Sequence, residues 1–182
     1  MQLSLVQRNA KRLLALVNQL LDFRKIQVQE MKLHPSFGDI IGFVKDISYS
    51  FLDIAEKKNI RFSFDTDIEH LEMYFDRNKM EKIMFNLLSN ARKFTQEGSI
   101  SISSGLSDNN EALLCIKDTG KGIDRDMMPR LFTRFASKSF QGTGLGLFIS
   151  KSIVEAHGGT IWAENNADGK GASFFFTLPF PR

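Results

Sequence analysis

The sequence predicts an α/β protein, a two-layer sandwich in which helices cover one face of a mixed sheet and an N-terminal helix protrudes. In the middle of the chain apolar residues recur at helical spacing, and short segments of alternating apolar and polar residues lie on both sides of that helix. Two glycine clusters follow a predicted strand and precede a predicted helix. This order of elements is typical of one sheet with helices packed against it.

Length and composition fit one globular domain with an appendage. The chain has 182 residues, 42% of them hydrophobic, which is enough for one sizeable core. The 24 basic and 21 acidic residues are spread along the sequence, so no charge block indicates nucleic-acid binding. The single cysteine, Cys115, lacks a partner for a disulfide or a Cys-x-x-Cys metal site and is expected in a strand of a protein from a reducing compartment. No stretch approaches the roughly 20 apolar residues of a membrane-spanning helix, so we expect a cytoplasmic domain.

The first 30 residues are predicted to form one long helix. Its apolar residues recur at alternating spacings of three and four, as in a coiled-coil seam: Leu3, Val6, Ala10, Leu13, Val17 and Leu20. Such a helix is about 45 Å long and cannot bury this seam on itself. Either a partner helix or the globular domain covers it. The regularity of the seam favours a partner helix, and therefore self-association.

The other elements follow from the same periodicities. Helices are predicted at 39–58, 77–95, 124–135 and 145–156. Strands are predicted at 60–64, 73–75, 99–103, 112–117, 160–164 and 172–178. Asp39 and Asp76 are the expected N-caps of the first two helices. The helix after Asp76 is the clearest amphipathic one, because its apolar residues fall at i, i+3, i+4, i+7, i+8 and i+11.

That helix also carries a polar face. Asn86, Asn90 and Lys93 are spaced i, i+4 and i+7, so they share the side opposite the apolar row. A polar helix face is usually only solvated. Asparagine is, however, a mediocre helix former, and its carboxamide oxygen suits a hard cation such as Mg²⁺. The pattern therefore leaves a solvated face and a ligand-binding face both open.

The first glycine cluster, 118–123, starts with a carboxylate at the end of a strand. An ionised Asp118 offers only acceptors, so it can accept a hydrogen bond from an exocyclic amine such as adenine N6. The glycines after it allow the backbone to approach a ring closely. The alternative is a plain Asp-x-Gly turn.

The second glycine cluster, 142–147, opens a helix and follows a loop. Unpaired backbone N–H groups and the positive end of a helix dipole form an anion site there. The spacing does not fit Gly-x-Gly-x-x-Gly, and the chain has no Gly-x-x-x-x-Gly-Lys-Ser/Thr segment. A dinucleotide-binding fold is therefore disfavoured and a P-loop is excluded.

Together the three segments resemble the ATP site of a known family. Residues 86–95 resemble the N box, 118–123 the G1 box, 131–135 the F box and 142–147 the G2 box of sensor histidine kinases. The likeness covers about 35–180 and identifies the catalytic, ATP-binding domain of a two-component sensor histidine kinase, from the family shared with gyrase, Hsp90 and MutL. It implies a Bergerat-type ATP-binding fold for 32–182. Residues 1–31 are similar to the second helix of the dimerisation hairpin, particularly in hybrid sensors.

The resemblance implies a role for each matched residue. Asn90 would coordinate Mg²⁺, Asn86 would lie beside it toward the phosphates, and Lys93 would neutralise phosphate charge. The base would be bound by Phe94, Asp118, Gly120, Gly122, Ile123 and Ser173. The phosphates would be held by Gly142, Thr143, Gly144, Leu145, Gly146 and Leu147. The lid would be anchored by Phe132 and Phe135, and Arg134 or Lys138 would face the terminal phosphate. The implied catalytic set is Asn86, Lys93, Arg134 and Lys138.

The same resemblance implies transfer of the γ-phosphoryl group of ATP to a histidine on a dimerisation helix of a homodimer, and from there to a response-regulator receiver domain. The ATPase relatives carry a glutamate base where this chain has Asn86, which cannot act as a base at neutral pH, so transfer is favoured over hydrolysis. A histidine followed by an acidic residue, as in the phosphoacceptor motif, does not occur in this chain. We expect the domain to be the cytoplasmic part of a membrane-anchored sensor. We also expect that this fragment does not autophosphorylate on its own.

Two alternatives share the nucleotide site. A protein serine kinase of the anti-sigma type would not need the seam of the first helix. A degenerate domain would only sense nucleotide and bind partners, although the expected pocket residues are all present.

Overall fold

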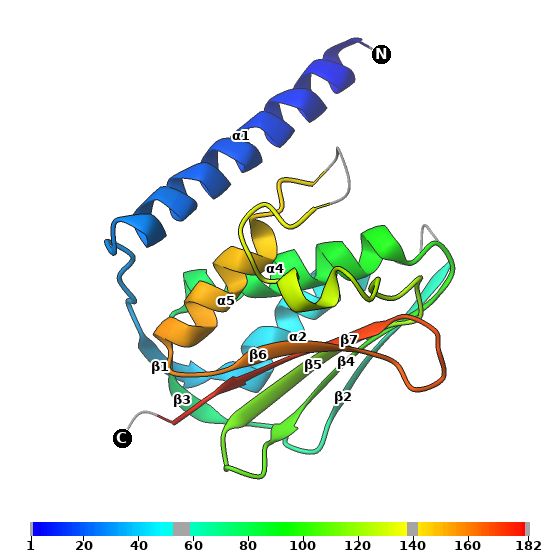
Figure 1. Cartoon of the computed structure of the whole chain (residues 1–182). Coiled ribbons are helices and arrows are strands. Elements are labelled where there is room, and N and C mark those ends of the chain that lie inside the picture. The colour runs from blue at the N-terminus through cyan, green and yellow to red at the C-terminus, as the bar shows by residue number, and fades with distance from the viewer. Residues whose placement is uncertain (1, 53–58, 138–141, 181–182) are drawn as a thin grey trace.

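The structure has two layers, with helices over one face of a sheet (Figure 1). It is a computed structural model that describes residues 2–52, 59–137 and 142–180. The helices are α1 (Gln2–Gln27), α2 (Ile40–Ser50), α4 (Arg77–Phe94) and α5 (Gly146–Ala156), with a 3₁₀ turn, η1 (Met128–Arg130). The strands are β1 (Ser36–Asp39), β2 (Ile60–Thr66), β3 (Glu72–Phe75), β4 (Gly98–Leu106), β5 (Ala112–Asp118), β6 (Ile161–Asn165) and β7 (Ala172–Leu178). The predicted α/β sandwich is confirmed.

The main sheet is mixed, with strand order β2-β4-β5-β7-β6. Strands β2 and β4 are parallel and the other neighbours are antiparallel, while β1 and β3 form a separate two-stranded sheet. Side chains alternate between the faces of a strand. Asp118 at the end of β5 therefore lies on the helix-covered face with Ile116, whereas Lys117 and its partner Ser173 lie on the other face.

The core forms between α4 and the centre of the sheet. Six apolar residues of α4 are at most 4% exposed: Met80, Ile83, Met84, Leu87, Leu88 and Ala91. Burial of each large side chain contributes about 1.5–3 kcal/mol relative to exposure. This burial determines the rotation of α4 about its axis, and it turns the polar face with Asn86 away from the sheet toward α5.

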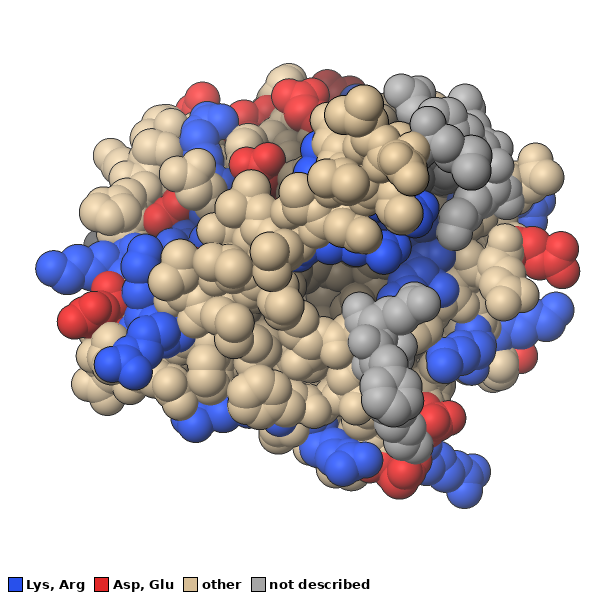
Figure 2. Space-filling model, turned by 90° about the horizontal axis from the view of Figure 1, so that it is seen from above, with Lys and Arg blue, Asp and Glu red and all other residues tan. Residues whose placement is uncertain are grey.

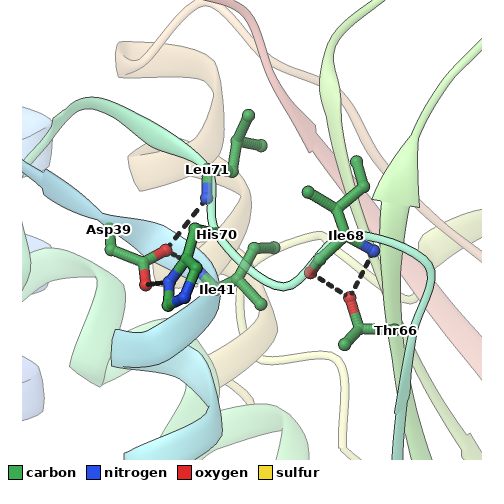
Figure 3. A network of polar contacts seen from close by, with 6 residues as sticks. All are labelled: Asp39, Ile41, Thr66, Ile68, His70 and Leu71. Carbon is green, nitrogen blue, oxygen red and sulfur yellow. Dashed lines mark hydrogen bonds and ion pairs between the residues drawn. The ribbon is translucent and has the colours of Figure 1, made fainter.

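Asp39 joins the start of α2 to the loop before β3, as Figure 3 shows. Its carboxylate accepts hydrogen bonds from the backbone N–H groups of Ile41, at 3.1 Å, and Leu71, at 3.0 Å. His70 Nδ1 lies 2.9 Å from the second carboxylate oxygen. Partial burial acts to raise the pKa of Asp39, but the hydrogen bonds from His70 and Leu71 outweigh it and lower the pKa. The predicted N-cap of α2 is confirmed.

Asp76 caps α4 and connects three segments. Its carboxylate accepts from the N–H of Lys79, at 3.0 Å, and from the N–H of His34, at 2.7 Å. Its own N–H donates to His157 Nε2, at 3.1 Å, while His157 Nδ1 lies 2.8 Å from the Ile153 carbonyl oxygen. Since Nε2 accepts, the proton of a neutral imidazole is on Nδ1. This network joins the segment after α1 to the start of α4 and the end of α5.

Helix α1 protrudes from the domain at its N-terminal end, and its C-terminal part lies beside α5 (Figure 1). None of its described residues is buried, and its seam is open: Leu3, Val6, Leu13, Leu14, Val17, Leu20 and Leu21 are all at least 42% exposed. Near its end, Phe23 and Ile26 pack against the core, and Asp22 pairs with Lys82 at 2.6 Å. The globular domain thus covers only the end of the helix. None of the described helices is both long and apolar enough to cross a bilayer.

The prediction of a helix at 124–135 is wrong. This segment contains two successive turns and the three-residue η1, with Met127 N–H donating to the Asp124 carbonyl and Thr133 N–H to the Arg130 carbonyl. Proline at position 129 has no N–H and cannot continue an α-helical ladder. Within the predicted helix over 39–58, α2 covers Ile40–Ser50, and residues 53–58 lie outside the described part.

Candidate functional site

The polar face of α4 lies against the beginning of α5. Asn86 is half-buried, and its Nδ2 donates to the Gly146 carbonyl and to Ser150 Oγ, both at 3.1 Å. Asn90 is half-buried one helical turn further along. Asn86 therefore connects the N-box helix to the glycine segment that opens α5.

Lys93 and Phe94 lie at the C-terminal end of α4. The Lys93 ammonium lies 5.3 Å from the centre of the Phe94 ring, and it would be 3.3 Å from a Cβ atom added to Gly142. Lys121 Nζ lies 5.1 Å from the centre of the same ring. The ends of three separate segments thus bring two cations and an aromatic ring together. Figure 2 shows a hollow near the centre of this face of the molecule, with Lys and Arg side chains gathered along one side of it.

Asp118 is at the end of β5 and is only 5% exposed. Its Oδ1 accepts from the N–H of Gly120, at 2.9 Å, and from the N–H of Ala172, at 3.4 Å. Burial raises the pKa of this carboxyl, and the two backbone N–H groups offset part of that rise. The carboxylate is held by backbone N–H groups of the loop after β5 and of β7, so it is oriented before any ligand arrives.

The G1 segment packs directly against the end of α4. Lys121 N–H donates to the Phe94 carbonyl at 3.4 Å. A side chain on Gly120 would overlap the same carbonyl group, whose carbon would be 2.8 Å from the added Cβ. The two walls predicted from the N and G1 boxes therefore adjoin each other, with Phe94 and Asp118 on neighbouring segments.

The second glycine segment, 142–147, contacts both α5 and α1. Thr143 Oγ donates to Gln19 Oε1 of α1 at 2.6 Å and accepts from the Leu145 N–H at 3.3 Å. Leu145 is buried and precedes the first residue of α5, and Leu147 packs against the core. Gly142 and Gly146 lie beside Lys93 and Asn86, respectively. The G2 residues are thus next to the N-box residues, as the resemblance implies.

The lid residues are divided between the core and α1. Phe132 packs edge-on against Phe174, with ring centres 6.3 Å apart. Phe135 is 60% exposed and contacts Phe23 of α1, with ring centres 5.6 Å apart. The Arg134 guanidinium lies over Phe23 at 5.7 Å, and over Phe148 of α5 at 5.5 Å. Arg134 is therefore placed against rings of α1 and α5. Lys138 lies outside the described residues.

Ser173 is not brought into the group around Asp118. Its hydroxyl donates to Asn166 Oδ1 at 2.6 Å, and its side chain lies on the sheet face opposite to that of Asp118. The neighbouring Ala172 instead faces Asp118 through its N–H. A strand reverses the direction of its side chains at every residue, so a shift of one residue moves a side chain to the wrong face.

Sequence reasoning also missed two asparagines at the end of β6. Asn165 hydrogen-bonds both backbone polar groups of Ile123, and Asn166 donates to the Asp118 carbonyl. The only signal in the sequence is an Asn-Asn pair before an Asp-Gly turn, which by itself predicts no more than a loop.

Comparison with known proteins identifies the family. A model described as "Histidine kinase-, DNA gyrase B-, and HSP90-like ATPase" matches residues 75–182, more than half of the chain. The chain belongs to this family. The histidine kinase-type ATPase domain is 41% identical over 182 residues to the sensor histidine kinase TmoS of Ectopseudomonas mendocina, covering 96% of this chain and 18% of that protein. It is 31% identical over 186 residues to the sensor histidine kinase WalK of Bacillus subtilis, covering 98% of this chain and 30% of that protein. The chain thus spans less than a third of the length of these relatives.

Solved structures of the same family have the same fold. Full-length ShkA in complex with AMPPNP superimposes with a TM-score of 0.87 at 27% identity, covering 97% of this chain and 38% of that chain. Histidine kinase ThkA in complex with the response regulator protein TrrA superimposes with a TM-score of 0.73 at 27% identity, covering 92% of this chain and 48% of that chain. The predicted family and fold are confirmed, and ATP binding by the domain follows from the family.

Proposed function

We propose that this domain binds Mg-ATP and transfers the γ-phosphoryl group to a histidine on a dimerisation helix in two-component signalling. The observation that carries the proposal is the meeting of three segments distant in sequence. Asn86 on α4 bonds the start of α5, Lys93 lies beside Gly142, and the segment after Asp118 packs on the end of α4. The ATPase family and the named histidine kinases among the relatives support it.

The residues present fit the nucleotide. Asp118 offers an oriented, nearly buried acceptor for the exocyclic amine of adenine, with Phe94 nearby as an aromatic surface for the base. Lys93 would face the phosphates and neutralise their charge. The described residues contain no cluster of three or more His, Cys, Asp or Glu that could hold a metal. Asn90 would therefore bind Mg²⁺ together with phosphate oxygens, and the ion would polarise the transferred group.

The chain's own residues would act by position and charge. In the structure Arg134 stacks on the rings of Phe23 and Phe148. For Arg134 to face the terminal phosphate, the lid would have to leave α1. Lys138 is the alternative cation in the proposal. Proximity and charge neutralisation are the main contributions to phosphoryl transfer, so no covalent intermediate on this domain is required.

The three histidines do not serve as the acceptor in this proposal. His70 bonds Asp39, and both ring nitrogens of His157 are engaged within the domain. His34 follows α1, and its backbone N–H donates to the Asp76 carboxylate. The acceptor would belong to a separate hairpin helix, the open seam of α1 would pair in a homodimer, and a receiver domain would take the phosphate next. The complex of ThkA with a response regulator supports the last step.

Transfer to a separately supplied hairpin tests the proposed function. The chain is mixed with γ-labelled Mg-ATP and a histidine-bearing dimerisation hairpin from a close relative. We expect acid-labile label on the hairpin, and none on a hairpin whose histidine is replaced by alanine. Label on serine would favour the serine-kinase alternative. ATP binding without transfer to hairpins from several relatives would favour the degenerate nucleotide-sensing module.

Asn86→Glu tests why the site transfers and does not hydrolyse. A glutamate here places a general base where the ATPase relatives have one, and we expect ATP hydrolysis to rise at least about tenfold. The variant also loses the Nδ2 donation to the Gly146 carbonyl, which costs about 1 kcal/mol of stability. Release of inorganic phosphate measures the effect. Asn86→Gln is the matched control, because it has the same length but no base. Equal hydrolysis by the two variants contradicts the proposed role of position 86.

A further inference from the structure

The turn between β6 and β7 holds both ends of the G1 segment, 118–123. At one end, Asn166 Nδ2 donates to the Asp118 carbonyl at 2.7 Å and to the Lys170 carbonyl at 2.6 Å, and its Oδ1 accepts from Ser173 Oγ. Three of the four hydrogen bonds that a carboxamide can make are thus made within the protein. Asn166 is half-buried, and it fixes the peptide group that follows Asp118.

At the other end of the segment, the Asn165 carboxamide hydrogen-bonds the backbone of Ile123 as a neighbouring strand would. Its Oδ1 accepts from the Ile123 N–H at 2.8 Å and its Nδ2 donates to the Ile123 carbonyl at 2.9 Å. Strand pairing of β5 has already ended at Asp118, so these backbone groups need another partner. Gly122 packs against the same carboxamide, since an added Cβ would lie 2.9 Å from Asn165 Oδ1.

The middle of the segment is held from the opposite side. Thr119 bonds the backbone of Ser99 on β4, and Lys121 N–H donates to the Phe94 carbonyl of α4. Asp118 is also held by its strand pairing with Ile100 of β4 and by the Ala172 N–H, and Ile123 packs against the core. In the proposed site Asp118 accepts from the base and Ile123 borders the base slot. The asparagine pair adds the hydrogen bonds that join both residues to the turn between β6 and β7, so the distance and angle between them depend in part on this pair.

We propose that Asn165 and Asn166 are positioning residues that set the discrimination between adenine and other purines, acting through Ile123 and Asp118. The inference rests on the proposed ATP site. With both carboxamides in place, the Asp118 acceptor faces the position of an exocyclic amine. Without either one, the segment moves, and the preference for an amine over a carbonyl at that position falls.

Two nucleotides separate this effect from a general loss of stability. Dissociation constants for Mg-ATP and Mg-ITP are measured by competition with a fluorescent ADP analogue, since ITP has a carbonyl where ATP has the amine. We expect Asn165→Ala and Asn166→Ala to weaken ATP binding roughly tenfold and ITP binding much less, so the ratio of the two constants shrinks. Asp168→Ala is the matched control, because the carboxylate of Asp168 accepts from the Lys170 N–H within the same turn and, among the described residues, makes no contact with the G1 segment. It should keep the wild-type ratio.

A second readout needs no nucleotide. Hydrogen exchange of the Ile123 amide should accelerate in Asn165→Ala and stay slow in Asn165→Asp, whose carboxylate still accepts that N–H. Asn165→Asp is also the milder variant if the alanine variants fold poorly. An unchanged ATP-to-ITP ratio in all three asparagine variants overturns the inference, whatever their melting temperatures. A wild-type chain that binds neither nucleotide overturns the proposed function and this inference with it. Unchanged exchange of the Ile123 amide in Asn165→Ala overturns the positioning role and leaves the proposed function standing.

Discussion

Asp118→Asn is expected to weaken ATP binding strongly and at the same time to raise the stability of the domain. In the proposed site this carboxylate accepts from adenine N6, and an amide there can turn a donor toward the amine. We expect affinity to fall at least about 100-fold, because the site is built around a hydrogen bond to a charged, desolvated group. The amide oxygen still accepts from the Gly120 and Ala172 N–H groups, so the local backbone is retained.

The gain in stability follows from the raised pKa of Asp118. The ordinary pKa is 3.8 and burial raises it in the folded state, so ionisation of this group favours the unfolded chain. The contribution of Asp118 is most favourable below pH 3.8 and is lost as the pH rises through the raised folded pKa. At pH 7 the asparagine variant should therefore melt at a higher temperature than the wild type, and the difference should vanish below pH 3.8.

Calorimetric titration with Mg-ATP, together with melting curves at several pH values, measures both effects. Asp108→Asn is the control, because it removes one negative charge from an exposed hairpin turn far from the site. Wild-type ATP affinity in Asp118→Asn would remove the basis of the proposed adenine site. An equal loss of affinity in Asp108→Asn would mean that the change in net charge, and not the loss of the Asp118 acceptor, weakens ATP binding.

Gly171→Ala is expected to give a large loss of stability, more than about 3 kcal/mol. Gly171 has a φ of +77°, and an added Cβ would overlap the Asp118 carbonyl oxygen and lie 2.6 Å from its carbon. The obstacle is backbone within the central strand, so it cannot rotate away as a side chain could. Because Asp118 would be displaced, ATP binding should fall as well.

Gly169→Ala separates backbone strain from overlap. Gly169 has the same φ of +77°, but nothing lies within 4 Å of an added Cβ. It should lose only about 1 kcal/mol, the cost of a left-handed conformation for alanine. Urea denaturation of both variants measures the difference. Equal losses would show that the contact with Asp118 has no energetic consequence.

Much of the fold could be predicted because its signals are local. The row of apolar residues on α4 and the N-caps Asp39 and Asp76 each act within a few residues, and the structure confirms all of them. The segment 124–135 failed for a local reason as well: a proline interrupts its hydrogen-bond ladder while its apolar residues still suggest a helix.

The candidate site was only partly predictable. Asn86, Lys93 and Asp118 could be singled out because their chemistry and spacing are visible in the chain, and the structure places their segments together. Ser173 could not be placed, since the face that it occupies depends on the register between β7 and β5. Arg134 could not be placed either, because its partners are rings on α1 and α5.

The class of the fold and the three segments of the proposed nucleotide site could be recognised from the amino-acid sequence alone. Periodicity, capping and glycine clusters are properties of neighbouring residues, so they can be read without knowing which strands pair. Three features required the folded structure: the strand order β2-β4-β5-β7-β6, the contact of the lid with α1, and the hydrogen bonds of Asn165 and Asn166 to the G1 segment. The pairings of β2 with β4 and of β5 with β7, the lid contact and the asparagine contacts each join residues more than 30 positions apart, and their energy depends on how the whole chain packs.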